Sequence, residues 1–214
     1  MIKKISLRDQ VSELLLDELC KGNLQPGERI NIASLAKELG VSATPMREAL
    51  FGLSEKGMIN FVNNKGFTMK ILNFQDAKDI YQITSVLEVE ALASSEAIDQ
   101  NMISKLFKLL EKLENEVKKN QLTFKTLSAF ENLMISQCKN KRLLNIISEL
   151  RYNVFQYEQV ILKSGLPIDN AFDKHREIIE LMSEQKLAQA AKCLGETWLG
   201  CVPLLEELLC SDIK

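Results

Sequence analysis

In one segment of this chain, apolar and polar residues alternate as they do in β-strands. In the segments around it, apolar residues recur every three or four positions, as they do in helices. Residues 58–62 and 67–71 each have the pattern of a short strand. The sequence Asn-Asn-Lys-Gly at 63–66 joins them as a turn, because Asn and Gly accept a positive φ. A single hairpin flanked by helices restricts the chain to a mainly α fold.

Three helices are predicted before the hairpin. The first has apolar residues spaced by three or four on one face, namely Leu7, Val11, Leu14, Leu15 and Leu19. The second covers residues 32–39 and ends at the corner formed by Gly40. The third has Thr44 as its N-cap and Pro45 at its first helical position, and it ends near Lys56. Three helices followed by a hairpin are the elements of a winged helix-turn-helix domain.

The strand pattern disappears after the hairpin, and helical periodicity continues to the end of the chain. We expect a first helix of about 25 residues capped by Asn73 and a second that starts after Asn101. Three more are expected at about 123–137, 141–163 and 168–184, and a sixth starts near Leu187. Gly195, Gly200 and Pro203 are expected to weaken or kink the last helix. The expected architecture is a winged helix-turn-helix domain of residues 1–72 followed by an all-α six-helix bundle of residues 73–214.

Composition and charge limit the location and the partners of the protein. The chain has no run of about 18 apolar residues and no signal-peptide core at its start, so we expect a cytoplasmic protein without a membrane span. Its five cysteines lack C-x-x-C spacing and it has one histidine, which argues against a structural zinc site. Lys and Arg outnumber Asp and Glu in residues 1–72, and the reverse holds afterwards. This asymmetry fits a DNA-binding head on an acidic body.

The segment that carries most information is LAKELGVSATPMREAL at residues 35–50. It resembles the hallmark of the GntR family of transcription regulators, L-A-x-x-L-G-V-S-R-T-P-V-R-E-A-L. The residues that follow, through 67, also fit the helix end and the wing of that family. The helical remainder is similar to the FadR-type branch, whose C-terminal domain is called FCD. The resemblance implies a transcription regulator with a dimerisation and effector domain.

The physical roles of the motif residues agree with DNA binding. A recognition helix places its N-terminal residues nearest the bases, where Arg47 makes a bidentate contact to guanine. The hydroxyls of Ser42 and Thr44 hold phosphates, Lys65 at the wing tip enters the minor groove, and Gly66 lets the backbone approach closely. The predicted DNA-binding residues are Ser42, Thr44, Arg47, Asn64, Lys65 and Gly66.

Two further expectations concern the operator. The family usually has an Arg where this chain has Ala43, and losing a major-groove Arg removes about 1–3 kcal/mol of base discrimination. The operator is therefore expected to differ from the one common in the family. A single recognition helix is too small to specify a genomic site, so we expect a homodimer bound to an inverted repeat in double-stranded DNA.

The resemblance also bears on metal binding. Many FCD domains hold a divalent metal through an Asp and three His residues, which align with Leu127, Glu131, His175 and Thr197 here. Only His175 is retained, and Glu131 is the one possible substitute ligand. Because a stable site usually needs three or more protein ligands, we predict no metal and no other cofactor.

The same alignment suggests where an effector binds. His175, Glu131 and Thr197 would point into the bundle, and Thr84 occupies a position where the family tends to have an Arg. Arg151 is then the remaining candidate to hold an anionic group, although a surface ion pair is an equally good reading of it. The predicted effector residues are Thr84, Glu131, Arg151, His175 and Thr197. We expect a small organic effector, anionic or partly apolar.

Two alternatives remain open at this point. In the first, the helical domain only dimerises and senses nothing. In the second, the chain is an enzyme, but it has no Gly-rich phosphate loop, no H-E-x-x-H motif and a single histidine for acid–base work. The sequence favours an effector-responsive DNA-binding regulator, which we expect to be a repressor.

Overall fold

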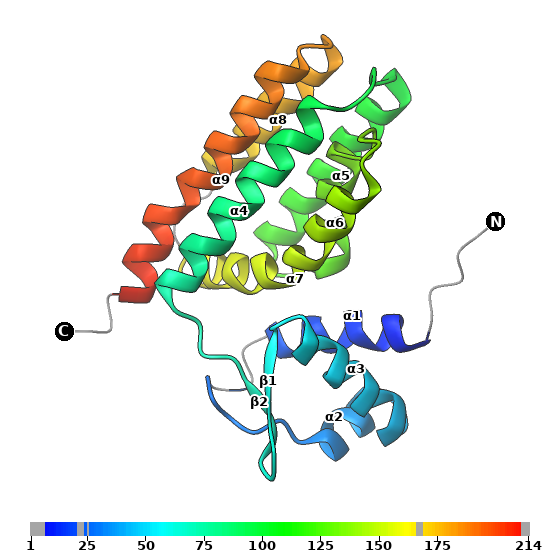
Figure 1. The fold of residues 1–214 in the computed structure, drawn as a ribbon, viewed down its shortest axis with the longest axis vertical. Helices are drawn as coiled ribbons and strands as arrows, with labels where there is room; N and C mark the ends of the chain where they lie inside the picture. The colour runs from blue at the N-terminus through cyan, green and yellow to red at the C-terminus, as the bar shows by residue number, and fades with distance from the viewer. Residues whose placement is uncertain (1–6, 21–23, 25, 166–168, 211–214) are drawn as a thin grey trace. The chain divides into compact units, whose positions relative to one another are not determined.

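The computed structural model describes the chain except for residues 1–6, 21–23, 25, 166–168 and 211–214. It divides into two compact units at residues 72 and 73. The predicted mainly α fold with one hairpin is confirmed (Figure 1).

The first unit contains three helices and a two-stranded sheet among its described residues. Their bounds are α1 (Leu7–Cys20), α2 (Ile32–Glu38), α3 (Ala43–Glu55), β1 (Ile59–Val62) and β2 (Gly66–Met69). The strands are antiparallel, with Ile59 opposite Met69. An isolated bridge between Arg29 and Thr68 adds the segment before α2 to the other side of β2. The hairpin is therefore the wing of a three-helix unit.

The structure corrects two local predictions in this unit. Helix α3 begins at Ala43 with Ser42 as its N-cap, so Thr44 lies inside the first turn and is not the cap. Pro45 is tolerated there because the N–H groups of a first turn have no intrahelical partner. In α1, Leu14 is 52% exposed whereas Leu16 is fully buried, because the helix is rotated relative to the face that the spacing indicated.

An aromatic cluster attaches the wing to α3. Phe51 of α3 packs against Phe61 of β1 and Phe67 of β2, with ring centroids 4.9 Å from each. Phe61 and Phe67 are themselves 5.0 Å apart. Such contacts stabilise beyond the area they bury. The cluster holds the hairpin in a fixed place relative to the recognition helix.

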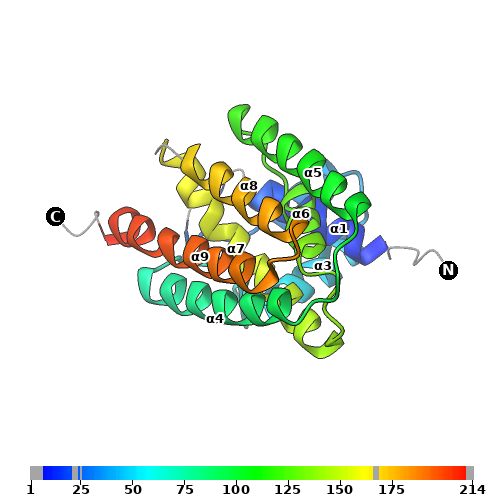
Figure 2. The same cartoon turned by 90° about the horizontal axis from the view of Figure 1, so that it is seen from above.

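The second unit is a bundle of six helices within the part that the structure describes. Their bounds are α4 (Phe74–Ala93), α5 (Gln100–Lys118), α6 (Phe124–Met134), α7 (Lys141–Lys163), α8 (Asp169–Ser183) and α9 (Leu187–Cys210). The side chains of Asn73, Asp99, Thr123 and Asn140 cap the first four by accepting a backbone N–H. Helices α4 and α9 run antiparallel, side by side (Figures 1 and 2).

Some helix ends in this unit differ from the prediction. Helix α4 ends at Ala93, several residues early, and α5 begins at Gln100 with Asp99 as its N-cap rather than after Asn101. Helix α6 ends at Met134, also several residues early. Residue 168, the predicted start of the fifth helix, lies outside the described residues. Helix α9 continues through Pro203, because packing of the flanking turns outweighs the one hydrogen bond that a proline removes.

Gly195 explains how closely α4 and α9 approach. A Cβ placed on Gly195 would lie 2.8 Å from a methyl carbon of Val89, closer than real side chains pack. The Ser85 hydroxyl donates to the Gly195 carbonyl oxygen at 3.3 Å across the same contact. The glycine therefore has a packing role between the two helices, which outweighs its low helix propensity.

Candidate DNA-binding surface and effector cavity

The predicted DNA-binding residues of α3 lie at its start and are exposed. Ser42, Thr44 and Arg47 all face solvent in the described structure, and so does Ala43. Thr44 and Arg47 are three residues apart, which places them on the same side of the helix. The start of α3 thus presents two hydroxyls and a guanidinium together, which suits phosphate and base contacts.

The wing tip has the backbone that the turn sequence predicts. Asn64 and Gly66 have φ values of 67° and 81°, in the left-handed region that Asn and Gly tolerate. The Lys65 N–H donates to the Val62 carbonyl oxygen at 3.0 Å and closes the turn. The Lys65 side chain is exposed at the tip. The turn therefore presents a cation and a glycine at the tip of the hairpin.

Sequence reasoning missed a second cation beside the wing. The Ile30 N–H donates to the Phe67 carbonyl oxygen at 2.9 Å, so the segment before α2 lies along β2. The exposed Arg29 side chain lies about 4 Å from the place a Gly66 Cβ would occupy. The bridge to Thr68 that positions Arg29 joins residues far apart in the sequence, so local spacing could not indicate it.

The helical unit encloses a largely apolar cavity. Its volume is about 460 Å³, within the range of small-molecule sites. The walls come from α5 to α9, and their apolar part includes Leu110, Leu113, Leu127, Phe130, Ile161 and Leu204. The polar side chains on the wall are Glu158, Lys174, His175, Glu196, Thr197 and Cys201. The cavity can hold an apolar molecule with one or a few polar groups.

A buried ionic cluster lies in the core of the same unit. The Arg151 guanidinium of α7 pairs with Glu88 of α4 at 2.8 Å and with Glu131 of α6. It also donates to the side-chain oxygen of Asn132 at 2.9 Å. The Trp198 ring N–H donates to Glu88 at 2.8 Å. The cluster therefore connects α4, α6, α7 and α9 through polar contacts.

Burial governs the protonation of this cluster. Loss of hydration raises the pKa of Glu131 to about 8, and the nearby Arg151 only partly offsets this. Loss of hydration likewise raises the pKa of Glu88. Burial lowers the pKa of Arg151, but the carboxylates of Glu131 and Glu88 outweigh this and raise it, so the guanidinium stays charged. Arg151 is therefore the shared counter-ion of Glu88 and Glu131, and at least one of these two carboxyl groups is readily protonated.

The structure separates the predicted effector residues into two groups. His175 and Thr197 line the cavity, whereas Thr84, Glu131 and Arg151 are buried elsewhere in the core. The Thr84 hydroxyl has no hydrogen-bond partner among the described atoms. Arg151 is engaged by two carboxylates, so the alternative of a surface ion pair does not apply to it.

Sequence reasoning missed four polar residues of the cavity wall, Glu158, Lys174, Glu196 and Cys201. Glu158 has the most defined surroundings of the four. It lies on α7 two turns after Arg151, and the Tyr81 hydroxyl of α4 donates to its Oε1 at 2.8 Å. Burial raises the pKa of Glu158, an effect that the Tyr81 hydrogen bond opposes. The seven-residue spacing from Arg151 was the available signal, because it places both side chains on one helix face.

His175 and Thr197 have defined surroundings on the cavity wall. The His175 ring packs edge-on against Phe130, with centroids 5.3 Å apart. The Thr197 hydroxyl donates to the Cys193 carbonyl oxygen at 2.9 Å, within its own helix. Both side chains are thus held in place before any ligand arrives.

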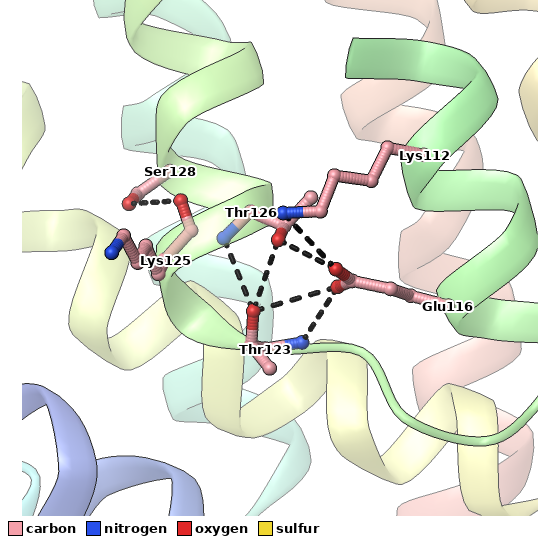
Figure 3. Close-up of polar contacts among 6 residues, drawn as sticks. All are labelled: Lys112, Glu116, Thr123, Lys125, Thr126 and Ser128. Carbon is pink, nitrogen blue, oxygen red and sulfur yellow. Dashed lines mark hydrogen bonds and ion pairs between the residues drawn. The ribbon is translucent and has the colours of Figure 1, made fainter.

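The start of α6, which carries two cavity residues, is anchored to α5 by Glu116 (Figure 3). The Glu116 carboxylate accepts the Thr126 hydroxyl at 2.8 Å and the Thr123 backbone N–H at 3.2 Å. Lys112 pairs with the same carboxylate at 3.4 Å. This network fixes the first turn of α6, and with it the positions of Leu127 and Phe130.

The residues present do not fit the metal site that the family resemblance brings into question. Leu127 has no electron pair to donate, and Glu131 is paired with Arg151 away from the cavity. Thr197 offers a neutral hydroxyl, a weak ligand for divalent transition metals. Within the described part of the chain, no three His, Cys, Asp or Glu side chains come together as a ligand group.

None of the helices that the structure describes has the length and apolar character needed to cross a bilayer.

Comparison with known families assigns both units. Residues 7–69 match the model of the bacterial regulatory proteins of the gntR family, and residues 79–198 match the FCD domain. The second match alone covers more than half of the chain. This chain belongs to the GntR family. The predicted family resemblance, FCD domain included, is thereby confirmed.

Individual relatives agree with this assignment. The chain is 34% identical over 172 residues to the Nta operon transcriptional regulator of Aminobacter aminovorans, covering 79% of this chain and 80% of the relative. It is 23% identical over 210 residues to the transcriptional repressor GlaR of Escherichia coli, covering 92% and 95%. The solved structure of Escherichia coli McbR/YncC has the same fold, with a TM-score of 0.80, 23% identity and coverage of 95% and 98%.

The comparisons fix the broad function of this GntR protein. Its matched domains and relatives are DNA-binding transcriptional regulators and not enzymes. This protein is therefore a DNA-binding transcriptional regulator.

Proposed function

We propose that this protein is a repressor that binds an inverted-repeat operator as a homodimer in the cytoplasm, and releases it when a small organic effector occupies the cavity of the helical unit. The observation that carries the proposal is the cavity itself. Its volume of about 460 Å³ and its mostly apolar wall are typical of a ligand site rather than of packing defects. The name of the repressor GlaR supports the direction of regulation.

The exposed face of α4 supports a dimer through the helical unit. Ile83 and Val86 are 51% and 68% exposed, and their spacing of three places them on one side of the helix. Large apolar side chains gathered on one face favour burial against a partner. Two copies related by a two-fold axis would present two recognition helices, which is what an inverted repeat requires.

The chemistry of the cavity supports a partly apolar effector. An anionic effector was expected to bind Arg151. The Arg151 guanidinium instead pairs with Glu88 and Glu131 in the core. The cavity wall instead has leucine, isoleucine and phenylalanine side chains with few polar groups. A helical unit that only dimerises would have no reason to keep such a space empty, since filling it would add stability.

A ligand screen with a blocked cavity tests this function. Small molecules are screened for a rise in melting temperature, and each hit is repeated on Leu127→Trp, which fills the cavity. The matched control is Phe107→Trp, which adds an indole to an exposed position of α5 away from the cavity. A true effector should raise the melting temperature of the wild type and of Phe107→Trp but not that of Leu127→Trp.

The same hits are then tested on DNA. Anisotropy of a labelled operator should show an affinity change of about 5-fold or more on adding a hit, the usual range of allosteric coupling. Hits that require the open cavity but leave operator affinity unchanged would refute effector control and favour a helical unit that only dimerises.

A further inference from the structure

The interior of the helical unit has more carboxylates than cations. Glu88 and Glu131 are buried in its core, the half-buried Glu158 lies near Glu131, and Arg151 is the arginine among them. The guanidinium contacts Glu88 and Glu131. Glu158 has a neutral phenol, that of Tyr81, as its hydrogen-bond partner. The negative charge of the core is therefore least compensated at Glu158.

Glu158 is also the one carboxylate of this group that reaches the cavity. It lines the wall together with apolar side chains, whereas Glu88 and Glu131 do not. Tyr81 occupies Oε1, and the described residues form no ion pair with this carboxylate. A desolvated carboxylate without a cation is costly, and a ligand that supplies one gains a strong, short hydrogen bond.

The other basic side chains on the wall do not supply that cation. The Lys174 ammonium is half-exposed and pairs with Glu177 at 3.1 Å. His175 packs edge-on against Phe130. Burial raises the pKa of Glu158, and the Tyr81 hydrogen bond lowers it. The counter-charge must therefore come from a ligand or from a proton.

We propose that the cavity binds an organic cation, an amine with an apolar body whose ammonium group pairs with Glu158. The inference rests on the proposed function, because it assumes that the cavity is the effector site. An anionic ligand would be repelled by the carboxylate of Glu158, which lacks a cation, whereas Glu88 and Glu131 share the charge of Arg151. A neutral ligand would gain the apolar contacts without relieving that charge. A cationic ligand with an apolar body gains the apolar contacts and also pairs with the charge of Glu158.

Three probes of the same length separate these classes. Hexylamine, hexan-1-ol and hexanoate are titrated into the full-length protein at pH 7.5 by calorimetry. The wild-type protein should bind hexylamine at least about tenfold more tightly than the alcohol and the acid, the effect of one buried charge-assisted hydrogen bond.

Two variants locate the preference. Glu158→Gln keeps an oxygen that accepts the Tyr81 hydroxyl but removes the charge, so the ratio of amine to alcohol affinity should fall to about twofold or less. Glu149→Gln removes a charge from an exposed carboxylate of the same helix, away from the cavity wall, and should leave the ratio unchanged. The intrinsic fluorescence of Trp198 checks that both variants keep the fold.

The outcomes distinguish this inference from the function on which it rests. Alcohol or acid binding as tightly as the amine would overturn the amine class and leave the cavity as an effector site. An amine preference that survives Glu158→Gln would place the cation elsewhere and overturn the role of Glu158. Failure of all three probes would also overturn the amine class, and the blocked-cavity screen with Leu127→Trp would judge the cavity independently.

Discussion

Arg151→Met should show how strongly the buried cluster holds the helical unit together. Methionine has similar length and no charge, so the change removes the ion pairs to Glu88 and Glu131 while leaving little empty space. It also removes the hydrogen bond to Asn132. Two carboxyl groups would remain buried without a cation.

The expected loss of stability is large and depends on pH. Removing one partner of a buried ion pair costs about 3–5 kcal/mol, because the other charge stays desolvated. The pKa of Glu131 is already raised to about 8 in the folded protein, and that of Glu88 is raised as well. Without Arg151 both values rise further, so the folded state holds protons that the unfolded state releases. Stability therefore falls as pH rises from about 4.5 toward 8, by up to about 1.4 kcal/mol per unit for each group.

Urea unfolding followed by Trp198 fluorescence measures this directly, because the chain has one tryptophan and it touches the cluster. The loss caused by Arg151→Met should be about 3–5 kcal/mol at pH 8 and distinctly smaller at pH 5.5. The control, Arg176→Met, breaks pairs with Glu114 and Asp173 at a position 42% exposed, and should cost about 1 kcal/mol or less at either pH. Equal losses for the two variants, or a loss independent of pH, would refute the reasoning.

The remaining predictions concern packing, DNA contacts and metal. Gly195→Ala should lower the free energy of unfolding by about 1–3 kcal/mol, because its methyl group collides with α4, whereas Gly200→Ala, with open space around it, should raise it by about 0.5–1 kcal/mol in the same urea assay. In DNA titrations, Arg47→Ala should cost about 1–3 kcal/mol at the operator and much less on random DNA, and equal losses would mean that it holds only phosphate. Lys65→Ala should weaken both and lower the salt slope by about one. Elemental analysis should find less than one metal per chain, with folding unchanged by chelator, and a full equivalent lost on His175→Ala would contradict this.

Most elements of the fold could be predicted from the sequence because they depend on local patterns. The period of apolar residues and the Asn and Gly of the turn lie within a few positions of one another. The start of a helix is harder to predict where either of two residues could be its N-cap. Thr44 precedes a proline and Ser42 does not, yet α3 begins after Ser42, since a first turn accommodates proline at more than one position.

The site was predictable only in part, because its chemistry comes from contacts between distant segments. The sequence could place His175 and Thr197 in the bundle through the family alignment, and both line the cavity. It could not reveal that Arg151 and Glu131, from different helices, neutralise each other. Nor could it reveal the Tyr81 hydrogen bond to Glu158, whose partners are 77 positions apart. Such pairs are set by helix packing rather than by spacing within a helix.

Selection of genomic DNA fragments by the purified full-length protein tests the central claim most directly. Retained fragments are sequenced from parallel selections with the wild-type protein and with Arg47→Ala. The wild type should enrich a short inverted repeat, with half-sites one helical turn apart, and the variant should lose this enrichment. Retention of fragments without a shared sequence, or enrichment that is identical with and without Arg47, would contradict the account.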